Sequence, residues 1–423
     1  MVSRTAQSEL RPKERKFDPL HVLLSSVQGR LPELLPLKYL RMSRSPFAFF
    51  RGAVAIMAAD LARLPHCGLH VQLCGDAHVQ NMGSFAAPDG KLIFDLNDFD
   101  ETIQGPWEWD VKRMATSIIL AGREARQKRS TRRAAAEAFV ESYCRSMAEF
   151  AGQPILFVAR HMIHREEGLQ PIHAALLQSR RVKPLDLLRK YTGKDRHGQP
   201  RFRDLPPASW RVKGRQARSV LASLGAYREC LGAEQRHLFN LFRALDVGFK
   251  VVGTGSVGMR DFVVLFEGNG PKDPLFLQIK QEMKSSYASY LRDVRYKHQG
   301  RRAAEGQRAI QPLSDLFLGW TAFGGHEYLV RQLNDHKGAI DLETLRGGGL
   351  ESLALVAGEL LARGHARTGN MQAIRGYCGS GSKIVKAIRD FASAYADQTE
   401  ADYTKFMAAV RSRKIKVAAE GTA

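Results

Sequence analysis

The chain has 423 residues, 44% of them hydrophobic, and its 64 Lys and Arg outnumber its 43 Asp and Glu, for a net charge of +21. This length exceeds the size at which single cores usually stop growing, so two structural units are expected. Five Cys, an odd number without paired spacing, argue against a disulfide framework. No apolar run approaches the ~20 residues of a transmembrane helix, and the polar first 17 residues do not resemble a signal peptide. We therefore expect a cytoplasmic protein without a membrane partner.

The first predicted elements are a helix and a strand. SPFAFFRG at residues 45–52 predicts the start of a helix that runs to Leu64, and residues 69–74 predict a strand. Arg51 follows three Phe that anchor the helix. Beside a phosphate site this Arg could bind an acceptor or a phosphate oxygen. The alternative is an ion pair that closes the start of the helix.

Two polar loops follow, GDAHVQN at residues 75–81 and FDLNDFDE at residues 94–101. Phosphoryl transfer depends on positioning an acceptor hydroxyl and neutralising phosphate charge with Mg²⁺, an ion that prefers oxygen ligands. Asp76 and Asn81 have the offset of Asp and Asn in the kinase pattern H-R-D-L-x-x-x-N. The two loops therefore predict a site for a metal-bound nucleotide phosphate. The alternative is that these residues only stabilise turns.

The pattern G-D-x-H-x-x-N, followed by an apolar strand that ends in Asp-Phe, resembles the catalytic and metal loops of aminoglycoside and choline kinases. The resemblance implies that Asp76 is the catalytic base and that Asn81 and Asp98 bind metal. Asp95 and Asp100 compete with Asp98 for the metal role, and Asp100 is retained as a further metal ligand.

A wider set of motifs, which adds GPWEWDVKR at residues 105–113, resembles a family of bacterial proteins of unknown function that is usually grouped with kinase-like folds. The chain departs from ordinary kinases at Cys74, where a His is usual. Residues 111–125 predict an amphipathic helix. Asp110 at its start resembles the structural Asp that braces the kinase catalytic loop, and a helix cap is the alternative role.

A basic segment lies between Arg180 and Arg218, with thirteen Lys or Arg and three Asp. Its Tyr191, Phe202 and Trp210 are interleaved with the charges, as in surfaces that stack bases or sugars. We expect either a solvated insertion or a surface for an anionic partner or nucleic acid. No helix-turn-helix or RNA-binding signature accompanies it.

VGTGSVG at residues 252–258 contains G-x-G-x-x-G, a pattern shared with dinucleotide-binding folds. Such a fold requires a helix next, whereas residues 261–266 and 275–280 both predict strands. A Gly-rich turn followed by a strand that ends in Lys is typical of the kinase nucleotide lid. Residues 328–333 then predict the last lid strand, which leads into a hinge that binds adenine.

In this interpretation Gly253, Gly255 and Gly258 let the backbone approach the phosphates. Lys280 pairs with the phosphates, and Glu305 in a later helix is the candidate that orients Lys280, with Glu282 as the alternative. Arg260 occupies the position after the third Gly where kinases often have Val, which implies a lid of different shape.

The catalytic loop precedes the Gly-rich lid, the reverse of the ordinary kinase order, which predicts a circularly permuted, two-lobe, kinase-like α+β fold. The expected units are a helical lobe over 1–245 with the basic insertion at about 180–218, a small antiparallel-sheet lobe over 246–337, and C-terminal helices over 338–423 that complete the helical lobe.

The predicted activity is ATP- and Mg²⁺-dependent phosphotransfer to a hydroxyl of a small molecule or protein. Two alternatives stay open. The same pocket could hold the nucleotide reversed and transfer a nucleotidyl group, or the fold could be a non-catalytic module that binds nucleic acid or a protein partner.

Overall fold

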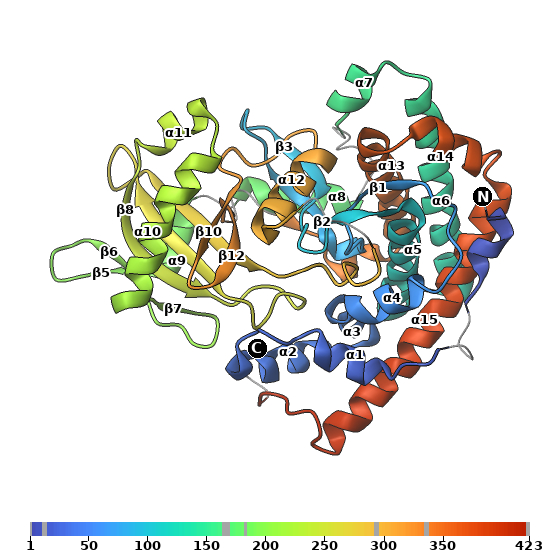
Figure 1. Cartoon of the computed structure of the whole chain (residues 1–423), viewed down its shortest axis with the longest axis horizontal. Coiled ribbons are helices and arrows are strands. Elements are labelled where there is room, and N and C mark those ends of the chain that lie inside the picture. Colours follow the sequence, from blue (N-terminus) through green and yellow to red (C-terminus); the bar gives the residue numbers. More distant parts are fainter. Residues whose placement is uncertain are drawn as a thin grey trace.

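The computed structural model describes residues 2–10, 15–162, 170–181, 184–291, 296–333 and 338–419. It combines helices with antiparallel strands, so the α+β class is confirmed. Figure 1 shows a sheet with its own helices at one end of the molecule and long helices at the other.

Four long helices form the framework of the helical part: α5 (Trp107–Glu124), α6 (Arg129–Ala151), α13 (Gly349–Thr368) and α15 (Ser382–Arg411). Helix α6 packs along α13, and α15 packs along α5. The helix expected at 111–125 corresponds to α5, which begins four residues earlier and ends one residue earlier, and Met114, Ile118 and Ala121 are buried in it at helical spacing. The C-terminal helices thus complete a core that the first half of the chain begins.

The shorter helices surround this framework. They are α1 (Pro19–Ser25), α2 (Leu35–Met42), α3 (Pro46–Gly52), α4 (Val54–Leu61), α7 (Ile155–Arg160), α8 (Gln170–Arg181), α14 (Met371–Cys378) and the 3-10 turns Arg4–Ser8, Pro32–Leu34, Val79–Asn81 and Leu342–Leu345. The single helix expected from residue 45 to Leu64 is divided into α3 and α4. The division falls at Ala53, whose φ of −121° and ψ of 38° are not helical.

The main sheet has six antiparallel strands in the order β11-β12-β10-β9-β8-β7. Their bounds are β7 Ser209–Arg211, β8 Arg243–Lys250, β9 Asp261–Glu267, β10 Pro274–Glu282, β11 Gly319–Phe323 and β12 His326–Gln332. The three strands predicted at 261–266, 275–280 and 328–333 are therefore confirmed to within two residues. Helix α12 (Gln299–Ile310) connects β10 to β11. The hinge is expected directly after Leu333, and residues 334–337 lie outside the described residues.

The segment before this sheet packs with it, which corrects the boundary expected at residue 245. Its elements are α9 (Pro184–Tyr191), β5 (Thr192–Lys194), β6 (Pro200–Phe202), β7, α10 (Gly214–Cys230) and α11 (Ala233–Phe239). Val220 and Phe239 share a core with Val264 of β9, and Phe202 shares another with Phe276 of β10. The apolar side chains of this segment thus cover both faces of the sheet.

The remaining strands carry the polar loops. They are β1 (His70–Leu73) with β4 (Ile103–Pro106), and β2 (Met82–Ala86) with β3 (Leu92–Leu96) and β13 (Gly338–Ala339). The loop from β3 to β4 contacts Lys280 of the main sheet, and the loop from β1 to β2 contacts the β3–β4 loop through Asn81.

All five Cys are free thiols. Across the described ranges, no helix combines the length and the apolar composition that crossing a membrane would require.

A buried ion pair joins α13 to β3 and gives a test of the fold. Arg363 Nη2 donates to Asp95 Oδ1 at 2.6 Å, and both side chains are 1% exposed. Removing one member of such a pair leaves a buried charge, so Arg363→Met should lower the free energy of unfolding by about 3–5 kcal/mol in chemical denaturation. Arg123→Met, which removes surface pairs to Asp397 and Glu400, should cost less than about 1 kcal/mol. Equal losses in the two variants would contradict this assignment.

Candidate active site

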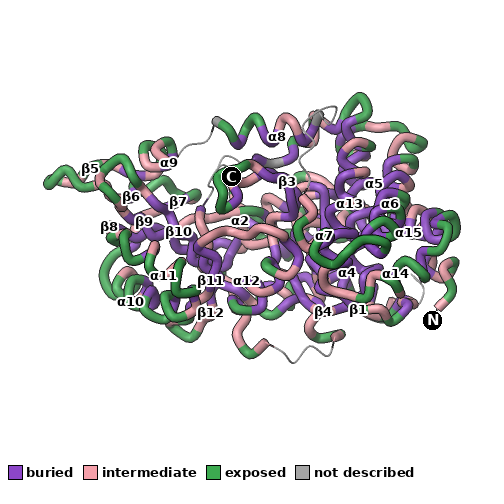
Figure 2. Tube along the Cα trace, turned by 90° about the horizontal axis from the view of Figure 1, so that it is seen from above, coloured by how far each residue is buried: buried purple, intermediate pink, exposed green. Residues whose placement is uncertain are grey.

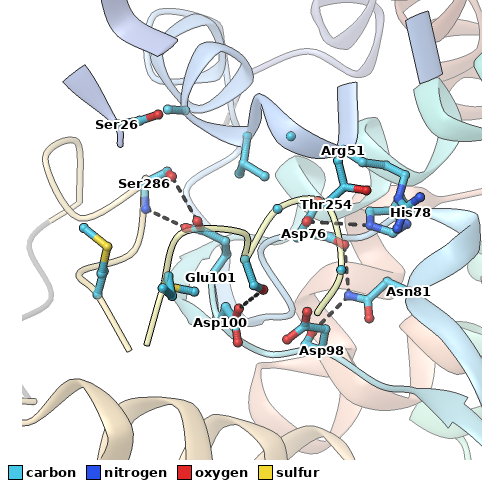
Figure 3. A pocket seen from close by; sticks show the side chains of 18 of the residues that line it. Ser26, Arg51, Asp76, His78, Asn81, Asp98, Asp100, Glu101, Thr254 and Ser286 are labelled. Atoms are coloured by element: carbon cyan, nitrogen blue, oxygen red, sulfur yellow. Dashed lines mark hydrogen bonds and ion pairs between the residues drawn. The ribbon is translucent and has the colours of Figure 1, made fainter. Parts of the chain in front are cut away.

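The loop that follows β1 turns sharply at Gly75, which has a φ of +84°. A Cβ atom at this position would lie 2.2 Å from the carbonyl oxygen of Glu101, so only Gly fits. The backbone N–H groups of Cys74 and Gly75 donate to the Asp110 carboxylate at 2.6 and 2.9 Å. The turn places Asp76 at the mouth of a cavity (Figure 3).

Asp110 therefore braces the loop, as its resemblance to the structural Asp of kinases implies. It does not cap its own helix, because α5 begins after Pro106 without a side-chain cap. His365 Nε2 lies 3.3 Å from Asp110 Oδ2, and His365 Nδ1 lies 2.9 Å from the Tyr143 hydroxyl. A buried chain of polar contacts thus connects α6 and α13 to the loop.

Arg113 holds the Asp76 carboxylate from below. Its Nε and Nη2 donate to Asp76 Oδ1 at 2.8 and 2.5 Å, and its guanidinium lies over the Phe50 ring. The other oxygen, Oδ2, is 3.6 Å from His78 Nε2. Burial lowers the pKa of His78 to about 3, so the imidazole is neutral at pH 7. Arg113 thus fixes Asp76 through Oδ1 and leaves Oδ2 available to a ligand.

Asn81 joins the two polar loops. Its Nδ2 donates to the carbonyl oxygens of Asp76 at 3.0 Å and Asp98 at 2.9 Å. Its Oδ1 is buried and has no hydrogen-bond partner. An orphaned amide oxygen between two carboxylate-bearing loops is a ligand of the kind that Mg²⁺ accepts.

Lys280 on β10 meets the second loop. Its Nζ lies 3.3 Å from Asp98 Oδ1 and 2.5 Å from Asp100 Oδ2, and the Lys side chain is 2% exposed. Burial alone would lower the pKa of Lys280, but the Asp100 and Asp98 carboxylates outweigh burial and raise it. Burial and the neighbouring Asp98 raise the pKa of Asp100. Asp95 is excluded from this group because it is committed to Arg363.

The prediction that Glu305 orients Lys280 is wrong. Glu305 accepts from Arg301 Nε at 2.7 Å on the outer face of α12. The inner face of that helix instead carries Arg302, which donates to the carbonyl oxygens of Thr102 and Asp100. Glu282, the alternative, is buried near Lys280, and burial raises its pKa well above the ordinary value. The direct partners of Lys280 are the two Asp.

The Gly-rich segment at 252–258 lies over the second loop, where the Ser256 hydroxyl donates to Asp100 Oδ2 at 3.0 Å. Its carbonyl groups accept hydrogen bonds from cations of the N-terminal segment. Arg30 donates to Gly255 and Val257, Lys38 to Thr254 and Gly255, and Arg41 to Gly253. Lys38 is buried, and burial lowers its pKa well below the ordinary value. No sequence motif had pointed to these three cations.

Two adjoining cavities meet at these residues. The first, here called the loop cavity, is lined by Asp76, Asn81, Arg51, Arg30 and the Gly-rich segment, among others. The second, the sheet cavity, is lined by Lys280, Gln278, Arg331 and Leu333, among others. Asp98, Gly253 and Ser256 line both. The site residues predicted from four distant stretches of the chain thus converge, apart from Gly258 and Glu305, which line neither cavity.

Within the described residues there is no group of three or more His, Cys, Asp or Glu that could hold a metal ion. A kinase-type Mg²⁺ site needs fewer protein ligands, because substrate phosphates supply the rest. Asn81 Oδ1 with Asp98 and Asp100 is compatible with that requirement.

The fold and the site define an α+β protein whose predicted polar site residues gather at two adjoining cavities. A family model described as "Uncharacterized protein conserved in bacteria (DUF2252)" matches residues 30–409, and the chain belongs to this family. The resemblance to a bacterial family of unknown function is thereby confirmed. Neither the curated proteins nor the solved structures gave a significant match.

His78 gives a test of the site by pH. Its pKa is about 3 in the folded chain and near 6.5 when unfolded, so the unfolded state binds a proton first as pH falls. Between pH 6.5 and 5 this group should lower the stability of the wild type by up to roughly 2 kcal/mol. His78→Gln should lose correspondingly less stability over the same interval in denaturant titrations. Parallel pH curves for the two proteins would refute the burial of a neutral imidazole beside Asp76.

Proposed function

We propose that this protein is an ATP- and Mg²⁺-dependent phosphotransferase with a circularly permuted, kinase-like arrangement of two lobes. The observation that carries the proposal is the convergence of Asp76, Asn81, Asp98, Lys280 and the Gly-rich segment at two adjoining cavities. These residue types are the ones that phosphoryl transfer uses: a base, metal ligands, a phosphate-binding Lys and close-approaching backbone.

The order of elements in the sheet supports the same proposal. A strand, a Gly-rich turn and a second strand (β8, 252–258, β9) are followed by β10, which carries Lys280, and then by helix α12. Kinases place their Gly-rich loop, their Lys strand and their αC helix in this order. The catalytic-type loop precedes these elements here, which is why the proposed arrangement is permuted.

The roles of the residues follow from their contacts. Asp76 would take the proton of the acceptor hydroxyl, and Arg113 keeps its carboxylate oriented toward the loop cavity. The hydroxyl oxygen forms a bond to the γ-phosphorus while the bond to the ADP oxygen breaks, and ADP leaves with the electron pair. Lys280 would pair with phosphate oxygens from the sheet cavity, where β12 and Leu333 lead toward the expected hinge.

Asn81, Asp98 and Asp100 would hold Mg²⁺. The bound ion would neutralise phosphate charge. The fit rests on the orphaned Asn81 Oδ1 and on the placement of Asp98 in both cavities. Lys280 contacts both Asp, so the residues that would hold the metal also pair with its ammonium.

Calorimetric titration tests the nucleotide site. ATP should bind the wild type with at least tenfold higher affinity in the presence of Mg²⁺, and Asp98→Asn should abolish most of that gain. Glu305→Gln should bind like the wild type, because Glu305 contacts Arg301 on the far face of α12. Absence of ATP binding to the wild type would overturn the proposal. ATP labelled at the α- or γ-phosphate then separates nucleotidyl from phosphoryl transfer.

A further inference from the structure

The loop cavity contains two guanidinium groups that no carboxylate neutralises by contact. Arg51 Nη1 donates to Gln80 Oε1 at 2.6 Å, and its Nε is buried without a partner. Arg30 Nη1 donates only to the carbonyl oxygens of Gly255 and Val257, and its Nε is likewise buried without a partner. Through the part of the chain that the structure describes, neither Arg has a carboxylate within ion-pair distance.

Several carboxylates of the same cavity are already engaged with other groups. Asp76 is held by Arg113, Asp100 by Lys280 and Ser256, and Glu101 by the backbone N–H and the hydroxyl of Ser286. These carboxylates act on Arg51 and Arg30 only from a distance and make no ion pair with them within the described residues. Burial has the largest effect on both Arg side chains and lowers their pKa. The Asp76 carboxylate has a smaller, opposite effect on Arg51. A buried cation without an anionic contact is costly.

The two cavities separate the cations by position. Arg51 and Arg30 line the loop cavity together with Asp76, whereas Lys280 and Arg331 line the sheet cavity. Figure 3 shows Arg51 and His78 on the same side of the cavity as Asp76, across from Asp100 and Glu101. An anionic group bound by Arg51 would thus lie in the loop cavity, beside Asp76, the proposed base.

We propose that the phosphoryl acceptor is an anionic molecule whose carboxylate or phosphate group is bound by Arg51, with Arg30 as a second cation, so that a neighbouring hydroxyl reaches Asp76. This inference rests on the proposed function and narrows its acceptor to hydroxy acids or phosphorylated alcohols. Arg51 binds in a bidentate manner because the guanidinium fork matches both anions. The sequence left open an ion pair at the helix start, and the structure gives Arg51 a neutral Gln80 there instead.

The test is calorimetry with three matched probes, glycerate, glycerol 3-phosphate and glycerol, at saturating Mg²⁺ and a non-hydrolysable ATP analogue. The analogue fills the nucleotide phosphate site, so that the probes report on the acceptor site. We expect one or both anionic probes to bind the wild type and glycerol not to bind. Preference for glycerate identifies a carboxylate site, and preference for glycerol 3-phosphate identifies a phosphate site.

Variants assign the binding to Arg51. Arg51→Gln should weaken the anionic probe at least tenfold, and Arg51→Lys should weaken it less because the charge remains. The matched control Arg189→Gln removes an exposed Arg on α9 and should leave probe binding unchanged. Affinity for the ATP analogue, measured in each variant, should stay within about threefold of the wild type and shows that the variant is folded.

Three outcomes would overturn the inference. If the ATP analogue binds and neither anionic probe does, the anionic acceptor is ruled out and the proposed function stands. Loss of analogue binding in folded Arg51→Gln would assign Arg51 to the nucleotide instead. Absence of analogue binding in the wild type would remove the proposed function itself, and the acceptor site with it.

Discussion

The buried ammonium of Lys280, held between Asp98 and Asp100, is the interaction on which the arrangement of this protein depends. Lys280 belongs to the six-stranded sheet, and the two Asp belong to a loop of the helical part. Burying an ammonium is costly unless carboxylates pair with it, so the Lys280 contacts hold the sheet and the loop together. That position creates the two cavities on either side of Asp98. Because one Lys is paired with two Asp, carboxylates outnumber ammonium groups at the place where a bound metal would neutralise phosphate charge.

Much of the site could be predicted because its signals are local in sequence. The spacing of Asp76 and Asn81, the strand pattern around Lys280 and the position of Asp110 each occupy a few residues. Glu305 could not be predicted, because the choice between Arg302 and Glu305 depends on the rotation of α12 about its axis. Arg113 could have been found, since it lies three residues after Asp110 on one helix face. Arg30 and Lys38 could not, because only tertiary packing brings them to the Gly-rich segment.

The basic segment shows the limit of composition as a guide to structure. Its aromatic residues suggested a surface that stacks bases, but Phe202 packs against Phe276 and Trp210 stacks on Phe249 within the protein. The charges themselves are displayed outward: Figure 2 shows the β5–β6 hairpin and α10 largely exposed. The aromatic residues therefore hold the segment on the sheet, and recognition of a partner would rest on charge alone. A nucleic-acid or other anionic partner for this surface stays a prediction.

Asp110, which braces the loop that carries Asp76, has its own partner His365 far along the chain. Asp110 emerges from the ribosome early, but its partner His365 lies 255 residues further along the chain. Helices α13 and α15, which complete the core around α5 and α6, are also made last. Domains generally fold during synthesis from the N-terminus, and here the direct contacts of the Asp76 loop with Asp110 and Arg113 come from α5, whereas the contact of His365 with Asp110 forms only when translation is nearly finished. A nascent or truncated chain would therefore have every residue of the polar loops but would lack the helices that complete the core around them.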